Sequence, residues 1–135
     1  MSAELERTLM GTTLTSSLST HQHLKNLKAV FGCNEDIISR FAVALSLRTG
    51  SIHPLWVAES ITQGLTVING KSIRGKTLFK TELSLFLVML AVAEPEVQEH
   101  QVREKIRLHW ERGVELMAQG LGDEDWLEYL YEQFR

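Results

Sequence analysis

Residues 70–77 read GKSIRGKT and match the phosphate-loop pattern, in which one glycine is followed by four residues and then by Gly-Lys-Thr. In a nucleotide hydrolase, the backbone N–H groups of this loop surround the phosphates, while the lysine and the hydroxyl contact phosphate and Mg²⁺. An apolar stretch precedes Gly70 and a helical pattern follows Thr77. The motif therefore raises the hypothesis of a nucleotide-hydrolysing enzyme.

The other parts of such an enzyme are missing from the sequence. Nucleotide hydrolases also hold Mg²⁺ with an acid at the end of a second apolar strand. The three aspartates of the chain, Asp36, Asp123 and Asp125, do not follow any apolar strand-like run. A parallel sheet also needs repeated strand–helix units, whereas the patterns after Thr77 are helical. We interpret the motif as a coincidence and expect no enzyme, metal or cofactor.

The same segment is nevertheless basic. No acid occurs between Ser60 and Thr81, and four cations fall within ten residues: Lys71, Arg74, Lys76 and Lys80. Glycines allow a backbone to approach a phosphate closely, while Lys and Arg supply the opposite charge. The helix expected before residue 32 adds Lys25 and Lys28. These residues are candidates for binding a nucleic-acid backbone, and the alternative is a solvated basic loop.

Charge is divided unevenly along the chain, although the net charge is only −3. Residues 11–80 contain eight Lys or Arg and three Asp or Glu, whereas residues 81–135 contain five and twelve. This division favours one face that meets a polyanion and another that avoids it. The alternative is scatter of charge over a solvated surface.

Composition indicates one globular domain over residues 1–135. The chain is 44% hydrophobic and 23% charged, with a polar, acidic start that does not resemble a secretory signal. The longest apolar run, residues 83–93, is too short to cross ~30 Å of hydrocarbon and predicts a core helix. The single cysteine, Cys33, excludes an internal disulfide and a cysteine zinc cluster. We expect a cytoplasmic protein that does not enter a membrane.

The pattern of residues 12–50 predicts a strand, a helix, a turn and a second helix. Residues 12–16 are short and β-branched, and Ser17 or Ser19 can cap a helix that ends before Gly32. Asn34 can cap the next helix, which ends at Gly50. This order is typical of a ribbon-helix-helix-like unit, whose strand we expect to pair with that of a second copy.

Residues 51–80 read as a basic loop region with one short strand over residues 65–68. The helical part, residues 81–135, begins with a helix that is apolar on all sides and is expected at the centre of the domain. A long amphipathic helix then runs from Val97 to Met117. Asp123 caps a last helix, whose aromatic stripe from Trp126 to Phe134 either covers the core or docks on a partner. The fold class is therefore mainly α.

Histidines give no further site. His21 and His23 are two residues apart and point in different directions on a helix, which makes a poor metal pair. His109 and Arg112 are three apart, which indicates a pair on a helix surface or at a subunit contact. Cys33 has no basic neighbour in sequence that would activate its thiol.

The run HLKNLKAVFGCNEDIISRFAVALSL, residues 23–47, resembles the start of the DndE family of DNA sulfur modification proteins. The matching residues are Leu24, Lys25, Leu27, Lys28, Gly32, Arg40, Ala42, Leu45, Ser46 and Leu47. Two later stretches are also similar to this family, GKTLFKTELSLFLVML at 75–90 and LHWERGVELMA at 108–118. The resemblance covers most of residues 14–118.

The resemblance implies a non-catalytic subunit of the DNA phosphorothioation system, a bacterial defence that replaces a non-bridging phosphate oxygen with sulfur. It assigns the sulfur chemistry to partner subunits: a cysteine desulfurase, an iron–sulfur sulfurtransferase and an ATPase. It also implies a homo-oligomer, with a tetramer as one option, and binding of nicked duplex DNA. Surface lysines are expected to make the contact, here Lys25 and Lys28 and also Lys71 and Lys76.

Two alternatives stay open at this point. A ribbon-helix-helix transcription regulator would read one palindromic sequence through Thr13 and Thr15. A protein–protein scaffold without DNA contact would use its basic half to bind an acidic partner.

Overall fold

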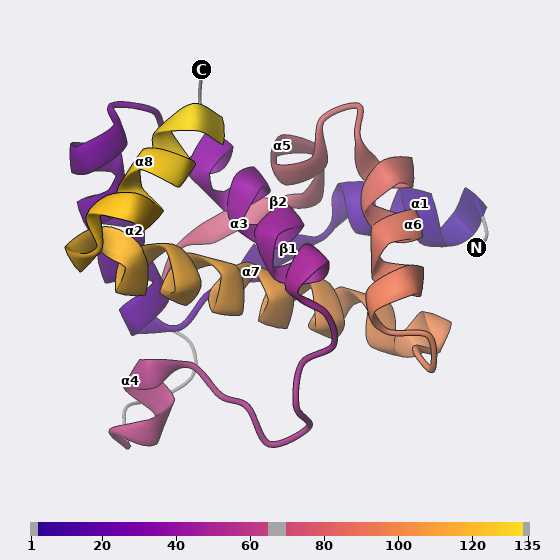
Figure 1. The fold of residues 1–135 in the computed structure, drawn as a ribbon. Helices are drawn as coiled ribbons and strands as arrows, with labels where there is room; N and C mark the ends of the chain where they lie inside the picture. Colours follow the sequence, from indigo (N-terminus) through magenta and orange to yellow (C-terminus); the bar gives the residue numbers. More distant parts are fainter. Residues whose placement is uncertain (1–2, 65–69, 134–135) are drawn as a thin grey trace.

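The computed structural model describes residues 3–64 and 70–133, and it is mainly α-helical, as the sequence predicts (Figure 1). The elements follow one another in this order: α1 (Ala3–Gly11), β1 (Thr13–Thr15), α2 (Leu18–Phe31), α3 (Glu35–Thr49), α4 (Glu59–Thr62), β2 (Ser72–Arg74), α5 (Gly75–Phe79), α6 (Leu83–Ala93), the 3-10 turn η1 (Glu99–Gln101), α7 (Val102–Gln119), the 3-10 turn η2 (Gly120–Gly122) and α8 (Glu124–Gln133).

The core is built on α3 and α7, which pack along each other at the centre of the molecule (Figure 1). Trp110 of α7 and Ile38 of α3 are fully buried. Gly113 of α7 lies so close to α3 that a Cβ atom there would overlap the Ala42 carbonyl. The absence of a side chain at Gly113 therefore permits the close approach of the two helices.

The predicted helix boundaries of the N-terminal unit are confirmed. Ser17 caps α2 by accepting a hydrogen bond from the Thr20 N–H, and Gly32 ends this helix with a left-handed φ of 68°. The Asn34 side chain caps α3 by accepting from the Ile37 N–H at 3.0 Å. Gly50 ends α3. Each boundary depends on short-range chemistry, in which a side chain or a glycine satisfies the unpaired groups of a helix end.

The prediction that β1 pairs with a second copy of the chain is wrong. β1 pairs antiparallel with β2 of the same chain, in the register Thr13↔Arg74, Leu14↔Ile73 and Thr15↔Ser72. We refer to this pair of strands as the ribbon. Leu14 and Ile73 are buried, so the apolar side of the ribbon is covered within the chain. The strand pairs internally because the segment expected to be loop supplies β2.

Residues 51–80 therefore contain more regular structure than the sequence indicates. They include α4, β2 and α5, and β2 leads directly into α5. The strand expected over residues 65–68 lies outside the described residues. The helix α1 was also not predicted, and it packs against α5.

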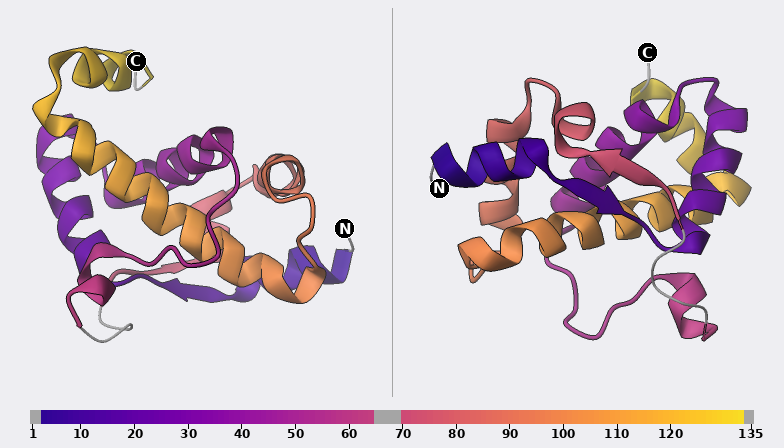
Figure 2. Two further views of the ribbon diagram at one scale, coloured as in Figure 1. Left: turned by 60° about the horizontal axis from the view of Figure 1, so that its bottom comes forward. Right: turned by 180° about the vertical axis from the view of Figure 1, so that it is seen from behind.

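The helix α6 lies at the periphery and not at the centre of the domain (Figures 1 and 2). Leu83, Phe86, Leu87 and Leu90 point into the core. The opposite face stays in solvent, with Leu85 at 54%, Val88 at 62% and Val92 at 79% exposure. A uniformly apolar helix predicts burial on all sides, but α6 packs against α3 and leaves this other face exposed. None of the described helices is both long and apolar enough to cross a membrane.

The long amphipathic helix begins at Val102, five residues later than predicted, after the short turn η1. The side chain of Gln101 accepts the Gln98 N–H at 2.9 Å and stabilises this turn. The predicted cap of the last helix is present, since Asp123 Oδ1 accepts the Asp125 N–H at 3.0 Å. The aromatic stripe of that helix lies outside the described side chains.

Candidate nucleic-acid interface

The outer side of the ribbon is polar and uncovered. Because side chains alternate along a strand, the burial of Leu14 and Ile73 places their neighbours on the opposite side. Thr13, Ser72 and Arg74 are exposed, and Thr15 is half-buried. Seen from behind in Figure 2, the ribbon lies on the surface with no helix in front of it. This surface carries hydroxyl groups and one guanidinium group, and no carboxylate comes from the strands themselves.

The predicted basic residues follow the ribbon into α5. Lys76 lies near the start of α5 and Lys80 directly after it, and both are exposed. Arg40 of α3 fixes the end of α5 by donating to the Leu78 carbonyl at 2.8 Å and the Thr77 carbonyl at 3.2 Å. The structure therefore presents Arg74, Lys76 and Lys80 from one anchored segment.

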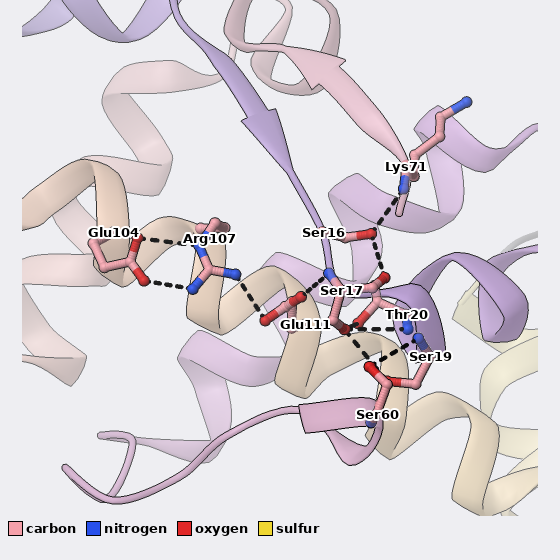
Figure 3. Close-up of polar contacts among 9 residues, drawn as sticks. All are labelled: Ser16, Ser17, Ser19, Thr20, Ser60, Lys71, Glu104, Arg107 and Glu111. Carbon is pink, nitrogen blue, oxygen red and sulfur yellow. Dashed lines mark hydrogen bonds and ion pairs between the residues drawn. The ribbon is translucent and has the colours of Figure 1, made fainter. Parts of the chain in front are cut away.

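Lys71 lies at the start of the same segment, beside a buried polar cluster. Its backbone N–H donates to Ser16 Oγ at 2.9 Å, and its carbonyl accepts the Ser16 N–H at 2.9 Å. The ammonium group points away from the cluster (Figure 3). The backbone of Lys71 is thus held in place while its charge stays outside.

The two glycines of the motif serve packing and not the approach of a phosphate. A Cβ atom on Gly75 would overlap the Leu9 carbonyl oxygen of α1, and one on Gly70 would overlap Ser16 and Ser17. Residues 72–74 of the motif form β2, whose backbone pairs with β1. The expectation that these glycines bring the backbone close to a phosphate is therefore wrong, because protein atoms occupy that space.

Lys25 and Lys28 lie elsewhere. Both are exposed on α2, and in Figure 1 α3 lies between α2 and α5. The six predicted residues therefore form two groups, one on α2 and one on the stretch from Lys71 to Lys80. We call the second group the β2–α5 basic segment.

The cations of this protein differ in how their charge is compensated. Arg107 forms ion pairs with Glu104 and Glu111, and Lys105 lies 3.8 Å from Glu94. Within the part of the chain that the structure describes, none of the six predicted cations forms an ion pair. Their positive charge is therefore available to an external anion.

A buried carboxylate anchors the start of α2, two residues after β1, to α7 (Figure 3). Glu111 is 1% exposed, and it accepts hydrogen bonds from the Ser17 backbone N–H and, at 2.9 Å, from Arg107. Arg107 also donates to Glu104, and this hydrogen bond raises the pKa of its guanidinium. The i, i+4 spacing of Arg107 and Glu111 was the available sequence signal, whereas their contact with Ser17 depends on the fold.

His109 is fully buried and not on a helix surface, so the interpretation of His109 and Arg112 as a pair on a helix surface is wrong. Its Nδ1 lies 2.8 Å from Ser46 Oγ and its Nε2 lies 2.9 Å from Glu94 Oε2. Burial lowers the pKa of His109 to about 4. Arg112 binds the Ser46 and Gly50 carbonyls at the end of α3.

These polar groups do not form an accessible reaction centre. Ser46 is fully buried, and its Oγ also accepts from Arg112 Nε at 2.8 Å, so the hydroxyl is committed to structure. Burial raises the pKa of the Cys33 thiol, which lowers its thiolate fraction. Among the described residues, no three His, Cys, Asp or Glu side chains are grouped to hold a metal.

Comparison with known proteins identifies the family. The model of the DNA sulphur modification protein DndE matches residues 14–123. The chain belongs to the DndE family. The crystal structure of DndE from Escherichia coli B7A, which is involved in DNA phosphorothioation modification, superposes with a TM-score of 0.56. It is 18% identical in sequence, and the match covers 80% of this chain and 96% of that one. A comparison with curated proteins gives no match.

The DndE match begins within β1, at Leu14, and ends at Asp123, directly before the last helix, so it includes all of the ribbon except Thr13. Several residues that carried the resemblance prove to secure the fold. Arg40 holds α5, Ser46 belongs to the buried network around His109, and Gly113 allows α7 to approach α3. In this DndE family member, these three positions build the scaffold that presents the basic segment.

Proposed function

We propose that this DndE family member is a non-catalytic subunit of the DNA phosphorothioation system that binds the backbone of duplex DNA. The observation that carries the proposal is the β2–α5 basic segment. Its four cations have no ion pair among the described residues, and Arg74 stands beside the exposed hydroxyls of the ribbon. Such a surface supports contact with phosphates, because binding releases the counterions that DNA condenses.

The character of the ribbon favours contact with the backbone over reading of the bases. Each strand has three residues, and the outward side chains of β1 are Thr13 and Thr15. Base readout in the major groove typically uses Arg, Lys, Asn or Gln on the inserted element. In addition, β1 is already paired with β2, and the Thr13 carbonyl on its other edge accepts from Arg103 at 2.7 Å. A dimeric ribbon made from two copies of β1 would break this contact.

The sulfur chemistry falls to the partner subunits in this proposal. Sulfur transfer from a cysteine desulfurase needs a reactive thiolate or a cluster with several cysteine ligands. Cys33 is the single cysteine of the chain, and it is half-buried with a raised thiol pKa. Its role is accordingly structural, and the subunit contributes DNA binding and scaffolding.

We also propose that the protein assembles with itself through α6, with a tetramer as one size to test. Leu85, Val88 and Val92 expose a continuous apolar face, and large exposed apolar patches mark interaction sites. A groove of about 240 Å³ adjoins it, lined in part by Glu6 of α1 and Val88 of α6. Val88→Asp should lower the sedimentation coefficient, whereas Leu55→Asp, an exposed apolar control in the segment between α3 and α4, should not. Equal sedimentation of both variants would remove α6 from the interface.

Fluorescence anisotropy with random-sequence duplex, intact and nicked, across a salt series tests the DNA contact. Neutralising Lys71, Arg74, Lys76 and Lys80 with Gln should weaken binding similarly for all sequences and lower the salt slope by up to ~0.9 per lost phosphate contact. Arg74→Gln is matched by Arg48→Gln, which removes the same charge from an exposed site at the end of α3. An unchanged slope in the fourfold variant would contradict the proposal for this segment.

The same experiment separates the alternatives. Strong preference for one palindromic sequence would indicate a transcription regulator. No binding at low salt would indicate a scaffold whose basic segment meets an acidic protein. Neutralising Lys25 and Lys28 as a pair then shows whether α2 belongs to the same DNA surface. Tighter binding of the nicked duplex by the wild type would support a role at nicks.

A further inference from the structure

Arg103 is an exposed cation that was not among the predicted DNA contacts. Its Nε donates to Thr12 Oγ1 at 2.8 Å, and one terminal nitrogen donates to the Thr13 carbonyl at 2.7 Å. Both acceptors are neutral, and Arg103 has no ion pair in the described part of the chain. The guanidinium is thus held at the edge of β1 with its charge uncompensated.

Arg103 does not stabilise α7, the helix to which it belongs. It is the second residue of α7, and the positive end of the helix dipole disfavours a cation there. One turn later, Arg107 compensates its charge with Glu104 and Glu111. Two arginines of the same helix therefore have different environments, and only Arg107 is neutralised by carboxylates.

The ribbon places Arg103 in line with Arg74. Arg74 faces Thr13 across the ribbon, where neighbouring strands lie roughly 4.8 Å apart. Arg103 binds Thr13 from the other edge of β1. The order across the surface is therefore Arg74, Thr13 and Arg103, with one hydroxyl between two cations.

The ribbon hydroxyls add donors to this row. The Thr13 hydroxyl has no hydrogen-bond partner among the described residues, and Thr13 is exposed. Thr15 Oγ1 and Ser72 Oγ lie 3.2 Å apart, so one of the two hydroxyls donates to the other. The accepting hydroxyl keeps its own hydrogen for an external acceptor. Phosphate oxygens accept from both hydroxyl and guanidinium groups.

We infer that Arg103 and Thr13 extend the DNA-binding surface across the ribbon, so that a phosphodiester backbone lies over Arg74, Thr13 and Arg103. This inference rests on the proposed binding of DNA and adds residues to that site. The ligand class follows from the chemistry: two cations that form no ion pair among the described residues, together with hydroxyl donors, bind a polyanion through its phosphates. Two hydrogen bonds already fix the Arg103 side chain, so this side chain loses little conformational freedom when it binds a phosphate.

Substitutions of Arg103 in the full-length protein test the inference. For each variant, fluorescence anisotropy measures how the affinity for duplex DNA changes with salt concentration. Arg103→Gln should lower the salt slope by ~0.9 and weaken binding roughly eightfold at ~0.1 M salt, the value expected for one phosphate contact. Arg103→Lys keeps the charge but loses the paired hydrogen bonds, so it should retain the slope. Arg48→Gln is the control for net charge, and thermal unfolding of each variant reports on folding.

Substitution of Thr13 tests the hydroxyl separately. Thr13→Val keeps the β-branched shape and the carbonyl that binds Arg103. It should weaken binding roughly tenfold, the lower end of the range for one hydrogen bond to a charged acceptor, with an unchanged salt slope because no charge is lost. The same affinity as the wild type would remove this hydroxyl from the site.

The outcomes distinguish this inference from the proposed function. If the wild type fails to bind duplex at low salt, the DNA-binding function itself is wrong. If the wild type binds and Arg74→Gln lowers the slope while Arg103→Gln does not, only the extension across the ribbon is wrong. A purely structural Arg103 would give equal losses of thermal stability in the Gln and Lys variants with no change in slope.

Discussion

His109 Nε2 lies 2.9 Å from Glu94 Oε2, and the two side chains are 0% and 8% exposed. This contact ties the residue that ends α6 to the middle of α7. On the other side of the ring, Nδ1 lies 2.8 Å from Ser46 Oγ of α3. Because burial lowers the pKa of His109 to about 4, the ring is neutral at pH 7. Its Nε2–H then donates to Glu94, and Nδ1 accepts from Ser46.

The buried histidine should make the protein less stable in mild acid. Its pKa is about 4 in the folded state and about 6.5 when unfolded, so between these values only the unfolded chain binds the proton. The free energy of unfolding should therefore fall as the pH drops from 6.5 to 4, by up to ~1.4 kcal/mol per pH unit. Urea unfolding of the wild type and of His109→Gln between pH 4.5 and 7 measures this contribution. Equal slopes in both proteins would contradict it.

Glu115 should make the protein less stable as the pH rises, which is the opposite of the effect of His109. Burial, followed by the nearby Glu59, raises its pKa to about 7, and its Oε2 is buried without a hydrogen bond among the described residues. The stability that this raised pKa adds to the folded state is present below pH 4.5, and it is lost as the pH rises to 7. Glu115→Gln should therefore raise the melting temperature at pH 7.5 and leave it unchanged at pH 4.5. Glu128→Gln is the exposed control, and a matching rise in that variant would argue for net charge as the cause.

Glu111 should be important for stability, and Glu104 should not. Both bind Arg107, but Glu111 is buried and also accepts from Ser17, whereas Glu104 is exposed. Removing one partner of a buried ion pair costs ~3–5 kcal/mol, while an exposed pair contributes ~0–1 kcal/mol. Chemical denaturation of Glu111→Ala and Glu104→Ala measures the difference. Similar losses in the two variants would show that burial is not the deciding factor.

Lys80 should be replaceable by glycine with a gain in stability. Its φ of 52° and ψ of −121° place it at the first central position of a type II′ turn, closed by the Glu82 N–H donating to the Phe79 carbonyl at 2.8 Å. Glycine adopts this conformation without steric strain. Lys80→Gly should raise the free energy of unfolding by ~1 kcal/mol. Lys80→Gln, which removes only the charge, should not raise it, and a gain there would point to electrostatics.

Gly75 should not tolerate a side chain. A methyl group there would overlap the Leu9 carbonyl of α1, so Gly75→Ala should destabilise the protein by ~1–3 kcal/mol or more. Gly11→Ala is the control, because a Cβ atom at that helix end meets no atom within 4 Å. Thermal unfolding of the two variants compares them. A neutral Gly75→Ala would show that α1 can move away from α5.

Short-range signals in the sequence predicted the helix ends well. Ser17, Gly32, Asn34 and Gly50 act within one turn of their own position, so their effect is visible without the fold. The strand β2 could not be found in this way, since its three residues, SIR, have too short a pattern and become a strand by pairing with β1. The position of α6 also escaped prediction, because composition does not say how many neighbours a helix has.

The basic residues of the candidate site could be predicted, because uncompensated charge is visible as a local run of Lys and Arg without acids. The role of the glycines among them was misread, since their close neighbours, Leu9 and Ser16, come from distant sequence. Arg103 carried no signal either. Its place in the candidate site depends on contacts with Thr12 and Thr13, which lie some ninety residues earlier in the chain.

The ribbon also constrains how the chain can fold during synthesis. Thr15 and Ser72 lie opposite each other but are 57 residues apart in sequence. At ~5–20 residues per second, β1 leaves the ribosome roughly 3–11 s before its partner strand is made. During that interval the helices α2 and α3 can form from local contacts, while the backbone of β1 has no strand to pair with. The nascent N-terminal half therefore passes through a stage with an open strand edge, the feature through which chains aggregate.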